Sequence, residues 1–337
     1  MIGKYRAGLC CAPTPDTRQQ TVLEAPKKRR LTLNDCQTGQ AVAYYHLPGL
    51  FEQFDFYRVF LPLFVAHREY FYPWCRIGSL YGAPADCLWG GGRVGGGTHS
   101  AQQVLALARR YGISARLTFS NSLLQPQHLA DPACNALCRL LQTGGGPQNG
   151  VIVHSELLLH YLRQHYPGLY LVSSTTKVLT DFAQLSRELA RPEFHFVVPD
   201  FRLNRALTQL VALPQAQKNK VELLCNECCD FGCQQRRACY AAVSRKNLGL
   251  PGPEHHCTAP HAAEGYRFSR AMANPGFIGV QDIQSRWLPM GFSHFKIEGR
   301  GLGSAVLLEL LLHYLTKPQY HLQVREALYL DPMLDLF

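Results

Sequence analysis

Six cysteines lie close together in one stretch of this sequence. The chain has 13 cysteines, and the six in this stretch are Cys225, Cys228, Cys229, Cys233, Cys239 and Cys257. Thiolates are soft ligands that bind zinc or iron-sulfur clusters, and in a reducing compartment close-set cysteines are more often ligands than disulfides. We therefore predict a metal site on Cys229, Cys233, Cys239 and Cys257, with Cys225 and Cys228 as alternates.

The cysteine spacing does not identify the metal. Three residues separate Cys229 from Cys233, five separate Cys233 from Cys239, and Cys257 follows a longer interval. This pattern fits one 4Fe-4S cluster, which we favour, or one structural zinc ion. The other seven cysteines lack ligand spacing and are expected to be ordinary small buried residues: Cys10, Cys11, Cys36, Cys75, Cys87, Cys134 and Cys138.

A second group of residues could perform acid-base chemistry. Glu227 follows Asn226 directly, and Glu298 stands two residues before Arg300. Paired carboxylates can share general acid and base roles, and a guanidinium can bind a substrate carboxylate. We predict that Glu227 and Glu298 are catalytic, although an ion pair of Glu298 with Arg300 or Lys296 would be merely structural.

Other candidate residues are predicted by position at the ends of expected strands. His154 and Asp200 are candidate proton-transfer groups, while Asn121, Thr175, Asn226 and Arg300 are candidate substrate-binding groups. Arg93 lies in the glycine-rich stretch 90–97, where glycines let backbone N–H groups approach an anion. The stretch matches no dinucleotide or P-loop pattern, so a plain surface loop is the alternative.

Composition limits the class of protein. With 337 residues and 47% hydrophobic residues the chain is expected to be globular, and its longest apolar runs are too short to span a membrane. We find no export signal and expect a cytoplasmic protein. The net charge of +10 favours anionic partners, either small molecules or RNA. The only dense basic run is Lys27 to Arg30.

Alternating apolar and helical patterns predict the fold. Eight strand-then-helix units indicate a (β/α)8 barrel, although a doubly wound open sheet shows the same alternation. The strands are expected at residues 76–81, 115–120, 151–155, 169–175, 194–200, 221–227, 277–280 and 294–298. In a barrel the ends of these strands converge on one mouth, which would bring the candidate residues and the cysteines together.

We expect four regions along the chain. Residues 1–40 read as a flexible N-terminal arm, and residues 41–75 as an aromatic helical segment covering the barrel. Residues 76–316 form the barrel with its cysteine-rich loop at 225–257, and residues 317–337 form a C-terminal tail. The aromatic segment could instead contact a partner subunit.

The motifs together resemble a known family. Lys296-Ile297-Glu298-Gly299-Arg300, following a cysteine-rich region, resembles the collagenase-like peptidases of unassigned mechanism, peptidase family thirty-two. The run Asn226-Glu227-x-Cys229-x3-Cys233-x2-Arg236 is similar to one branch of it. The resemblance covers roughly residues 76–316.

The resemblance implies a barrel with a 4Fe-4S cluster on four cysteines. Some members of the family take part in oxygen-independent hydroxylation of RNA or of a ubiquinone precursor, with prephenate implicated as oxygen donor. The expected function is therefore an iron-sulfur enzyme that performs or assists such hydroxylation. A peptidase in which Glu227 or Glu298 activates water is the alternative, and a non-catalytic cluster-bearing subunit is a third. This chain departs from better-known members by its extra cysteines at 225, 228 and 239 and its aromatic N-terminal segment.

Overall fold

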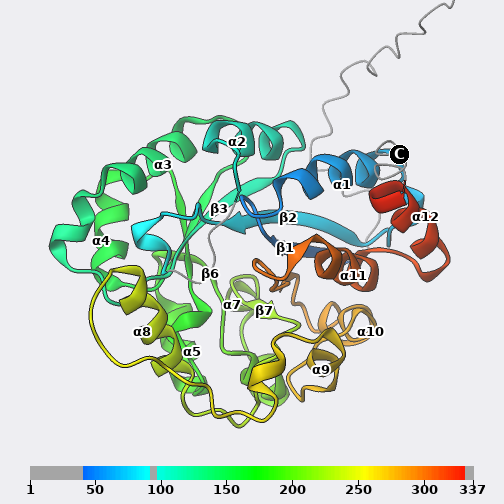
Figure 1. The fold of residues 1–337 in the computed structure, drawn as a ribbon. Coiled ribbons are helices and arrows are strands. Elements are labelled where there is room, and N and C mark those ends of the chain that lie inside the picture. Colours follow the sequence, from blue (N-terminus) through cyan, green and yellow to red (C-terminus); the bar gives the residue numbers. More distant parts are fainter. Residues whose placement is uncertain (1–40, 92–96, 331–337) are drawn as a thin grey trace, which may run out of the picture. The chain divides into compact units, whose positions relative to one another are not determined.

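A ring of eight parallel strands forms the centre of the protein (Figure 1). The computed structural model describes residues 41–91 and 97–330. The arm at 1–40 and Arg93 therefore lie outside the described residues, as do Cys10, Cys11 and Cys36. The strands are β1 Ala43–Pro48, β2 Cys75–Gly82, β3 Ser114–Phe119, β4 Gly150–Val153, β5 Tyr170–Ser173, β6 Phe194–Val197, β7 Glu222–Leu224 and β8 His294–Lys296.

The ring closes between β6 and β7, and this is its least regular strand contact. The strand order is β6-β5-β4-β3-β2-β1-β8-β7, and every pairing is parallel. The two outer strands of that order meet through a parallel bridge between Val197 and Val221, where the Val197 amide donates to the Lys220 carbonyl at 2.8 Å. The predicted (β/α)8 barrel is confirmed, because in an open sheet β6 and β7 would each have one edge without a partner strand.

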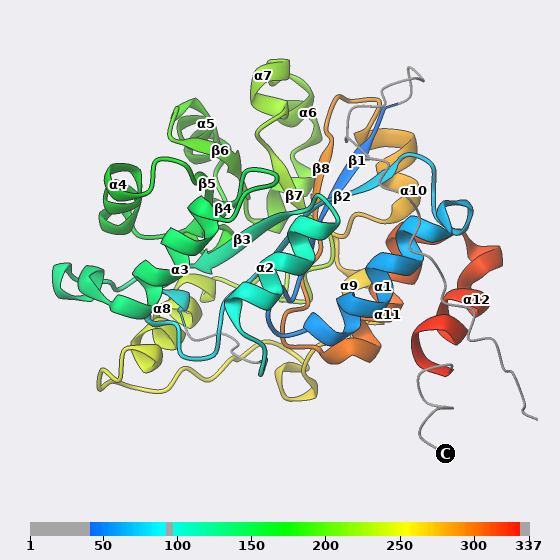
Figure 2. The same ribbon diagram turned by 90° about the horizontal axis from the view of Figure 1, so that it is seen from above.

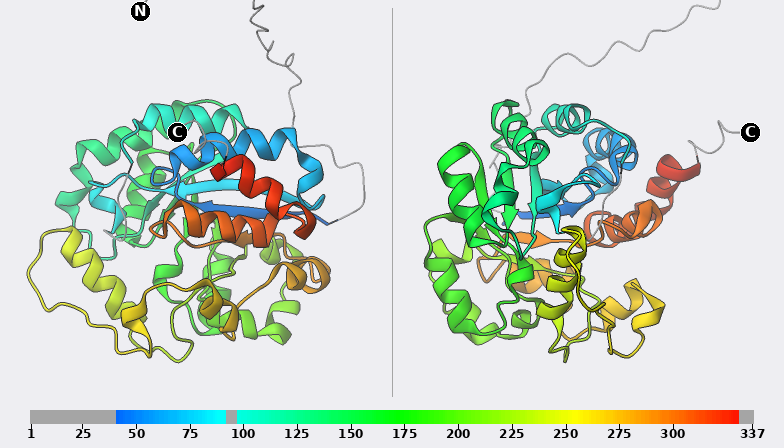
Figure 3. Two further views of the ribbon diagram at one scale, coloured as in Figure 1. Left: turned by 45° about the vertical axis from the view of Figure 1, so that its right-hand side comes forward. Right: turned by 60° about the vertical axis from the view of Figure 1, so that its left-hand side comes forward.

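Helices cover the outside of the ring, as Figure 2 shows. They are α1 Phe54–Ala66, α2 Ala101–Arg110, α3 Pro132–Thr143, α4 Glu156–His165, α5 Phe182–Ala190, α6 Leu207–Val211, α7 Gln215–Lys218, α8 Arg236–Asn247, α9 Phe268–Ala273, α10 Val280–Asp282, α11 Gly303–Leu315 and α12 His321–Arg325. Figure 3 shows α1, α11 and α12 side by side. None of the helices in the described part of the chain is both long and apolar enough to span a membrane.

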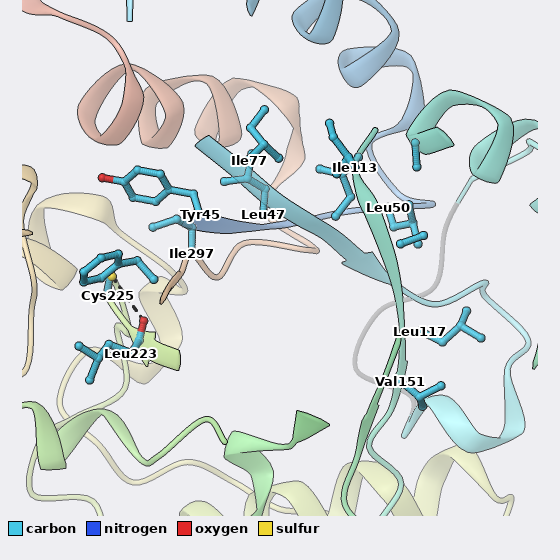
Figure 4. Packing of buried hydrophobic residues seen from close by; sticks show 14 of the residues in the cluster. Tyr45, Leu47, Leu50, Ile77, Ile113, Leu117, Val151, Leu223, Cys225 and Ile297 are labelled. Carbon is cyan, nitrogen blue, oxygen red and sulfur yellow. Dashed lines mark hydrogen bonds between the residues drawn. The ribbon is translucent and has the colours of Figure 1, made fainter. Parts of the chain in front are cut away.

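Side chains of the strands separate into two buried layers. One set points outward and packs under the helices; Figure 4 shows Tyr45, Leu47, Leu117 and Leu223 among these residues. A second apolar cluster holds residues of the opposite strand face, such as Ile152, and these side chains fill the inside of the ring. The alternation follows from the period of two residues in a β-strand.

The barrel begins one strand earlier than predicted. Residues 43–48 were expected to belong to a helical covering segment, but they form β1 and pair with both β2 and β8. This strand is buried almost throughout, so it lacks the polar alternation that marks an exposed strand. The aromatic helix itself is present as α1, and its aromatic side chains are buried within this chain.

Two other segments also differ from the sequence prediction. Residues 277–280 form no strand; the Ile278 amide donates to the Cys225 carbonyl at 3.0 Å, and α10 begins at Val280. The ladder position beside β7 is occupied by β8, so the sheet has no place for this segment. The expected C-terminal tail contains α12, in which Val324 is fully buried.

Candidate active site at the barrel mouth

A cavity of about 860 Å³ opens at the C-terminal ends of the strands. Its lining includes several residues that the sequence analysis selected: Thr175, Glu227, Cys228, Cys229, Cys257, Glu298 and Arg300. It also includes Tyr81, Tyr266 and Lys296, which were not selected as functional residues. Active sites of such barrels are built at this end, so the cavity is the candidate site.

Asn226 fixes the position of Glu298. The Asn226 side chain is fully buried; its Oδ1 accepts a hydrogen bond from the Glu298 amide at 2.8 Å, and its Nδ2 donates to the Glu298 carbonyl at 3.0 Å. Nδ2 also lies 3.0 Å from the Tyr266 hydroxyl. Asn226, predicted to bind substrate, thus ties the end of β7 to the end of β8. It is a positioning residue for Glu298.

Two tyrosines, Tyr81 and Tyr266, lie close enough to Glu298 for its charge to affect their pKa values. Burial raises the pKa of Tyr81, and the negative charge of Glu298 raises it further. The pKa of Tyr266 is raised by the same two causes, in the same order. Both hydroxyls therefore stay protonated at neutral pH and can serve as hydrogen-bond donors beside the cavity. Tyr81 uses its hydroxyl to donate to the Ile297 carbonyl at 2.7 Å.

Arg300 pairs with a residue that the sequence analysis did not consider. Its Nε and Nη2 both lie 2.8 Å from Oε1 of Glu52, a side chain in the loop between β1 and α1. Glu52 is nearly buried and accepts a further hydrogen bond from the Phe51 amide at 3.3 Å. The anticipated ion partners of Arg300 and Lys296 were local in sequence, but these pairs join neighbouring strands. Glu52 follows β1 and the partner of Lys296 lies on β7, and both strands pair with β8. Glu52 thereby fixes one edge of the guanidinium at the cavity wall.

Glu227 is held in a buried ion network. Its carboxylate contacts Arg236 and accepts hydrogen bonds from the Cys228 and Cys229 amides at 3.1 and 3.0 Å. Arg236 also lies 3.3 Å from Asp200, whose carboxylate binds Arg202 at 2.6 Å. The Glu227 carboxylate is thus already engaged by a guanidinium and two amides, which leaves it less available for proton transfer to a substrate. The network fastens the cysteine-rich loop to the barrel.

Of the remaining predicted residues, only Thr175 belongs to the cavity lining. His154 shares a 2.8 Å hydrogen bond with Thr176, and Asp200 is fully buried in the network just described. Asn121 is fully buried as well; its Nδ2 donates to the carbonyls of Leu88 and Ser244 at 3.4 and 3.3 Å. Thr175 lines the cavity, and its hydroxyl donates to the Pro199 carbonyl at 3.3 Å.

The six clustered cysteines occupy different environments. Cys228, Cys229 and Cys257 line the cavity, while Cys233 and Cys239 are partly exposed outside its lining. Cys225 is fully buried in the core, where its thiol donates to the Leu223 carbonyl at 3.5 Å. Burial raises the pKa of Cys229 to about 12, an effect that the nearby Arg236 charge opposes. Across residues 41–91 and 97–330, no three His, Cys, Asp or Glu side chains are grouped closely enough to hold a metal ion.

A layer of charged residues fills the barrel below the cavity. Glu222 on β7 is fully buried and lies 2.5 Å from Arg116, 3.3 Å from Lys296 and 3.5 Å from His46. Sequence reasoning missed this layer. The signal was there, because each of these residues interrupts an otherwise apolar strand at a position that faces inward. A charged residue inside a buried strand is rare unless it is paired.

Comparison with known proteins yields one structural neighbour to report. Neither a protein-family profile nor a curated protein matches this sequence. The chain is similar to the solved structure of the U32 peptidase Mk0906, with a TM-score of 0.48 and 12% sequence identity. The similarity covers 78% of this chain and 95% of that chain. The family resemblance drawn from the sequence motifs stays a prediction.

Two partly buried histidines predict a loss of stability in mild acid. Burial lowers the pKa of His154 and of His294 to about 4 each, below the value near 6.5 in an unfolded chain. The unfolded state therefore binds more protons between pH 6.5 and 4, and the free energy of unfolding falls as the pH falls through that range. Each histidine contributes up to ~1.4 kcal/mol per pH unit. Urea unfolding between pH 7 and 4.5 measures the slope.

A single variant tests the assignment of this slope. His154→Gln keeps a hydrogen-bonding group for Thr176 but removes the titration, so its free energy of unfolding should depend less steeply on pH than that of the wild type. The exposed His67 provides the control, and His67→Gln should leave the slope unchanged. Equal slopes in His154→Gln and the wild type would show that His154 does not titrate as described.

Proposed function

We propose that this chain is an enzyme that acts on an anionic substrate bound in the mouth cavity. One observation carries the proposal: Glu298, Arg300 and Lys296, all at the end of β8, line the same cavity. Two cations and one carboxylate beside one cavity can bind an anion and move a proton. The net charge of +10 also favours an anionic partner.

The residues at the mouth would have separate roles in binding and proton transfer. Arg300 would bind a carboxylate or phosphate group, oriented by its pair with Glu52. Glu298, whose backbone is fixed by Asn226, would serve as the acid-base group. Glu227 is the weaker candidate, because Arg236 and two backbone amides already engage its carboxylate. Its role would be to hold the cysteine-rich loop in place.

The anion-binding role of Arg300 is testable without knowing the substrate. Arg300→Gln should weaken the binding of inorganic phosphate and of succinate by about 10- to 150-fold, because one charge-assisted hydrogen-bonding group is worth ~1.5–3 kcal/mol. Isothermal titration calorimetry on the full chain measures both anions. Arg325→Gln is the matched control, since Arg325 pairs with Glu309 on the exposed surface. Equal affinities in wild type and Arg300→Gln would exclude Arg300 as the anion site.

For the reaction class we propose oxygen-independent hydroxylation assisted by an iron-sulfur cluster, as the family resemblance implies. The support from the structure is limited to position: Cys228, Cys229 and Cys257 line the substrate cavity. As arranged here the cysteines do not fit a cluster, because no three donors among the described residues are grouped. Binding would require the loop that carries Cys257 to approach Cys229.

Metal analysis tests the cofactor directly. We expect protein purified without oxygen to contain iron and acid-labile sulfide, and Cys229→Ser to lose both because a ligand is removed. Cys75→Ser is the control, because Cys75 is buried and is distant in sequence from the cysteine-rich loop. Zinc without sulfide would replace the cluster with a structural metal site, and neither metal in freshly isolated protein would remove the cofactor from the proposal.

A peptidase is the alternative reaction class. In that case Glu298 would activate water in the cavity and no redox cofactor would be needed. Cleavage of a peptide library by metal-free protein, lost in Glu298→Gln, would favour the peptidase over the hydroxylase.

A non-catalytic subunit is the third class. The aromatic face of α1, which was its suggested contact with a partner, is buried within this chain. RNA as substrate and a cytoplasmic location also remain proposals.

A further inference from the structure

We propose that Lys296 is a carbonyl-reactive residue that forms an imine with an anionic aldehyde or ketone in the mouth cavity. The inference rests on the proposed anion-binding mouth and adds a chemical class of substrate to it. Lys296 lies on β8, two residues before Glu298 and four before Arg300. A ligand whose acidic group contacts Arg300 could therefore present a neighbouring carbonyl to the Lys296 amine.

The surroundings of Lys296 favour a nucleophilic amine. The side chain is almost completely buried, yet it lines the cavity, so a ligand there meets the amine without bulk water around it. Nζ stands 3.6 Å from the centre of the Tyr81 ring and 3.3 Å from Oε1 of Glu222. The same carboxylate also binds Arg116 at 2.5 Å. Two cations thus share one carboxylate, which limits how far it stabilises either of them.

These contacts change the protonation of the amine. Burial lowers the pKa of Lys296 to about 8; Glu222 opposes the shift, and the positive charges of Arg116 and Arg300 add to it. A larger fraction of this amine is therefore unprotonated at neutral pH than for a lysine on the surface. The titratable and charged groups that face it from the neighbouring strands are Tyr81, His46, Arg116, Glu222 and Arg300.

The proposed step is balanced within the cavity. The unprotonated amine attacks the carbonyl carbon, and the carbinolamine that forms loses one water molecule to give the imine. The amine's two protons leave with the carbonyl oxygen as that water, so no oxidant or reductant takes part. Glu298 lies beside the same cavity and could transfer protons to the departing hydroxyl. Hydrolysis reverses the reaction, so the imine is observable only when it is trapped.

Reductive trapping tests the inference on the full chain. Glyoxylate, an aldehyde acid, and propionaldehyde, an uncharged aldehyde, are each incubated with the protein and sodium cyanoborohydride, which supplies the hydride that makes the bond permanent. Peptide mapping by mass spectrometry then locates the modified lysines. At pH 7.5 we expect Lys296 to be modified by glyoxylate about tenfold or more faster than surface lysines, because more of its amine is unprotonated.

Lys220 is a built-in control. Its pKa is also lowered by burial, but its amine donates to the carbonyls of Leu189 and Arg191 at 2.8 and 2.7 Å, and it does not line the cavity. If a low pKa alone caused labelling, both lysines would react. Lys296→Arg keeps a cation beside Glu222 but cannot form the imine, so labelling at this position should be absent. The wild-type map is informative even if that variant does not fold.

The outcomes separate this inference from the proposed function. Preferential labelling of Lys296 by glyoxylate, reduced in Arg300→Gln, supports both. Equal labelling of Lys296 by glyoxylate and propionaldehyde supports a reactive amine but contradicts the anion-binding mouth. Absence of labelling at Lys296 in protein that still binds phosphate or succinate through Arg300 overturns the imine proposal and leaves the proposed function intact.

Discussion

Replacing Glu222 with alanine is expected to lower the free energy of unfolding by about 3–5 kcal/mol, the cost of leaving a buried charge without its partner. Glu222 is fully buried and contacts both Arg116 and Lys296 inside the barrel. Arg116 is also nearly inaccessible to solvent, so it cannot gain water in place of the lost carboxylate without a rearrangement. Urea unfolding of the wild type and Glu222→Ala at pH 7 measures the difference.

A surface pair provides the matched control. Glu309→Ala removes the same chemical group from an ion pair with Arg325 in which both side chains are more than two-fifths exposed, and should cost about 0–1 kcal/mol. The double variant Arg116→Met with Glu222→Met should recover much of the stability that Glu222→Ala loses, because well-packed apolar residues can replace a buried ion pair. A cost for Glu222→Ala as small as that of Glu309→Ala would mean that water reaches the barrel interior.

The strands of this barrel can be predicted from its sequence, but the partners in its charged layer cannot. Strand alternation predicts the fold, because seven of the eight predicted strands overlap observed ones. The eighth, at 277–280, is not a strand, and β1 completes the ring instead. Strand alternation cannot assign partners: Arg116, Glu222 and Lys296 lie far apart in sequence. They meet only because β7 pairs with β8 and the Arg116 side chain, on β3, reaches Glu222 inside the ring. Glu52 escapes prediction for the same reason, since nothing local to Arg300 points to the loop after β1.

The strand that was misplaced is equally instructive. The sequence Ala-Tyr-Tyr-His-Leu-Pro at β1 is buried on both faces, and such a strand carries no alternation to separate it from a buried helix. The aromatic residues just after it do follow a helical spacing and form α1. Without β1, the predicted barrel begins at β2, and closing the ring would place β2 next to β8. In the structure β1 lies between them.

The residues selected at strand ends divide into two groups in space. Glu298, Arg300 and Thr175 line the cavity, whereas Asn121, Asp200 and Asn226 are buried and hold neighbouring segments together. Both groups consist of polar or charged residues at or just after strand ends. Exposure to the cavity separates them, and it depends on how far the loops after each strand extend over the ring. That information is tertiary and cannot be read from spacing along the chain.

Arg236→Ala is expected to lower the free energy of unfolding by about 3 kcal/mol, because it leaves the nearly buried Glu227 without its cation. Asp200 keeps its pair with Arg202, so the loss falls mainly on the cysteine-rich loop. Hydrogen exchange should show it locally: the amides of Cys228 and Cys229, which donate to Glu227, should exchange faster.

Two further variants decide whether Glu227 is a structural or a catalytic residue. Arg237→Ala, one position along the same helix, is the control; its side chain is exposed and donates to the Val178 carbonyl at 3.1 Å, so the cost should stay below about 1 kcal/mol. In a double-mutant cycle, Glu227→Gln and Arg236→Ala should show a coupling energy of about 0.5–3 kcal/mol, since the two groups touch. If Glu227→Gln instead keeps full stability and normal exchange at Cys228 and Cys229, the carboxylate is not a structural clasp. Glu227, and not Glu298, would then be the preferred candidate for the acid-base group.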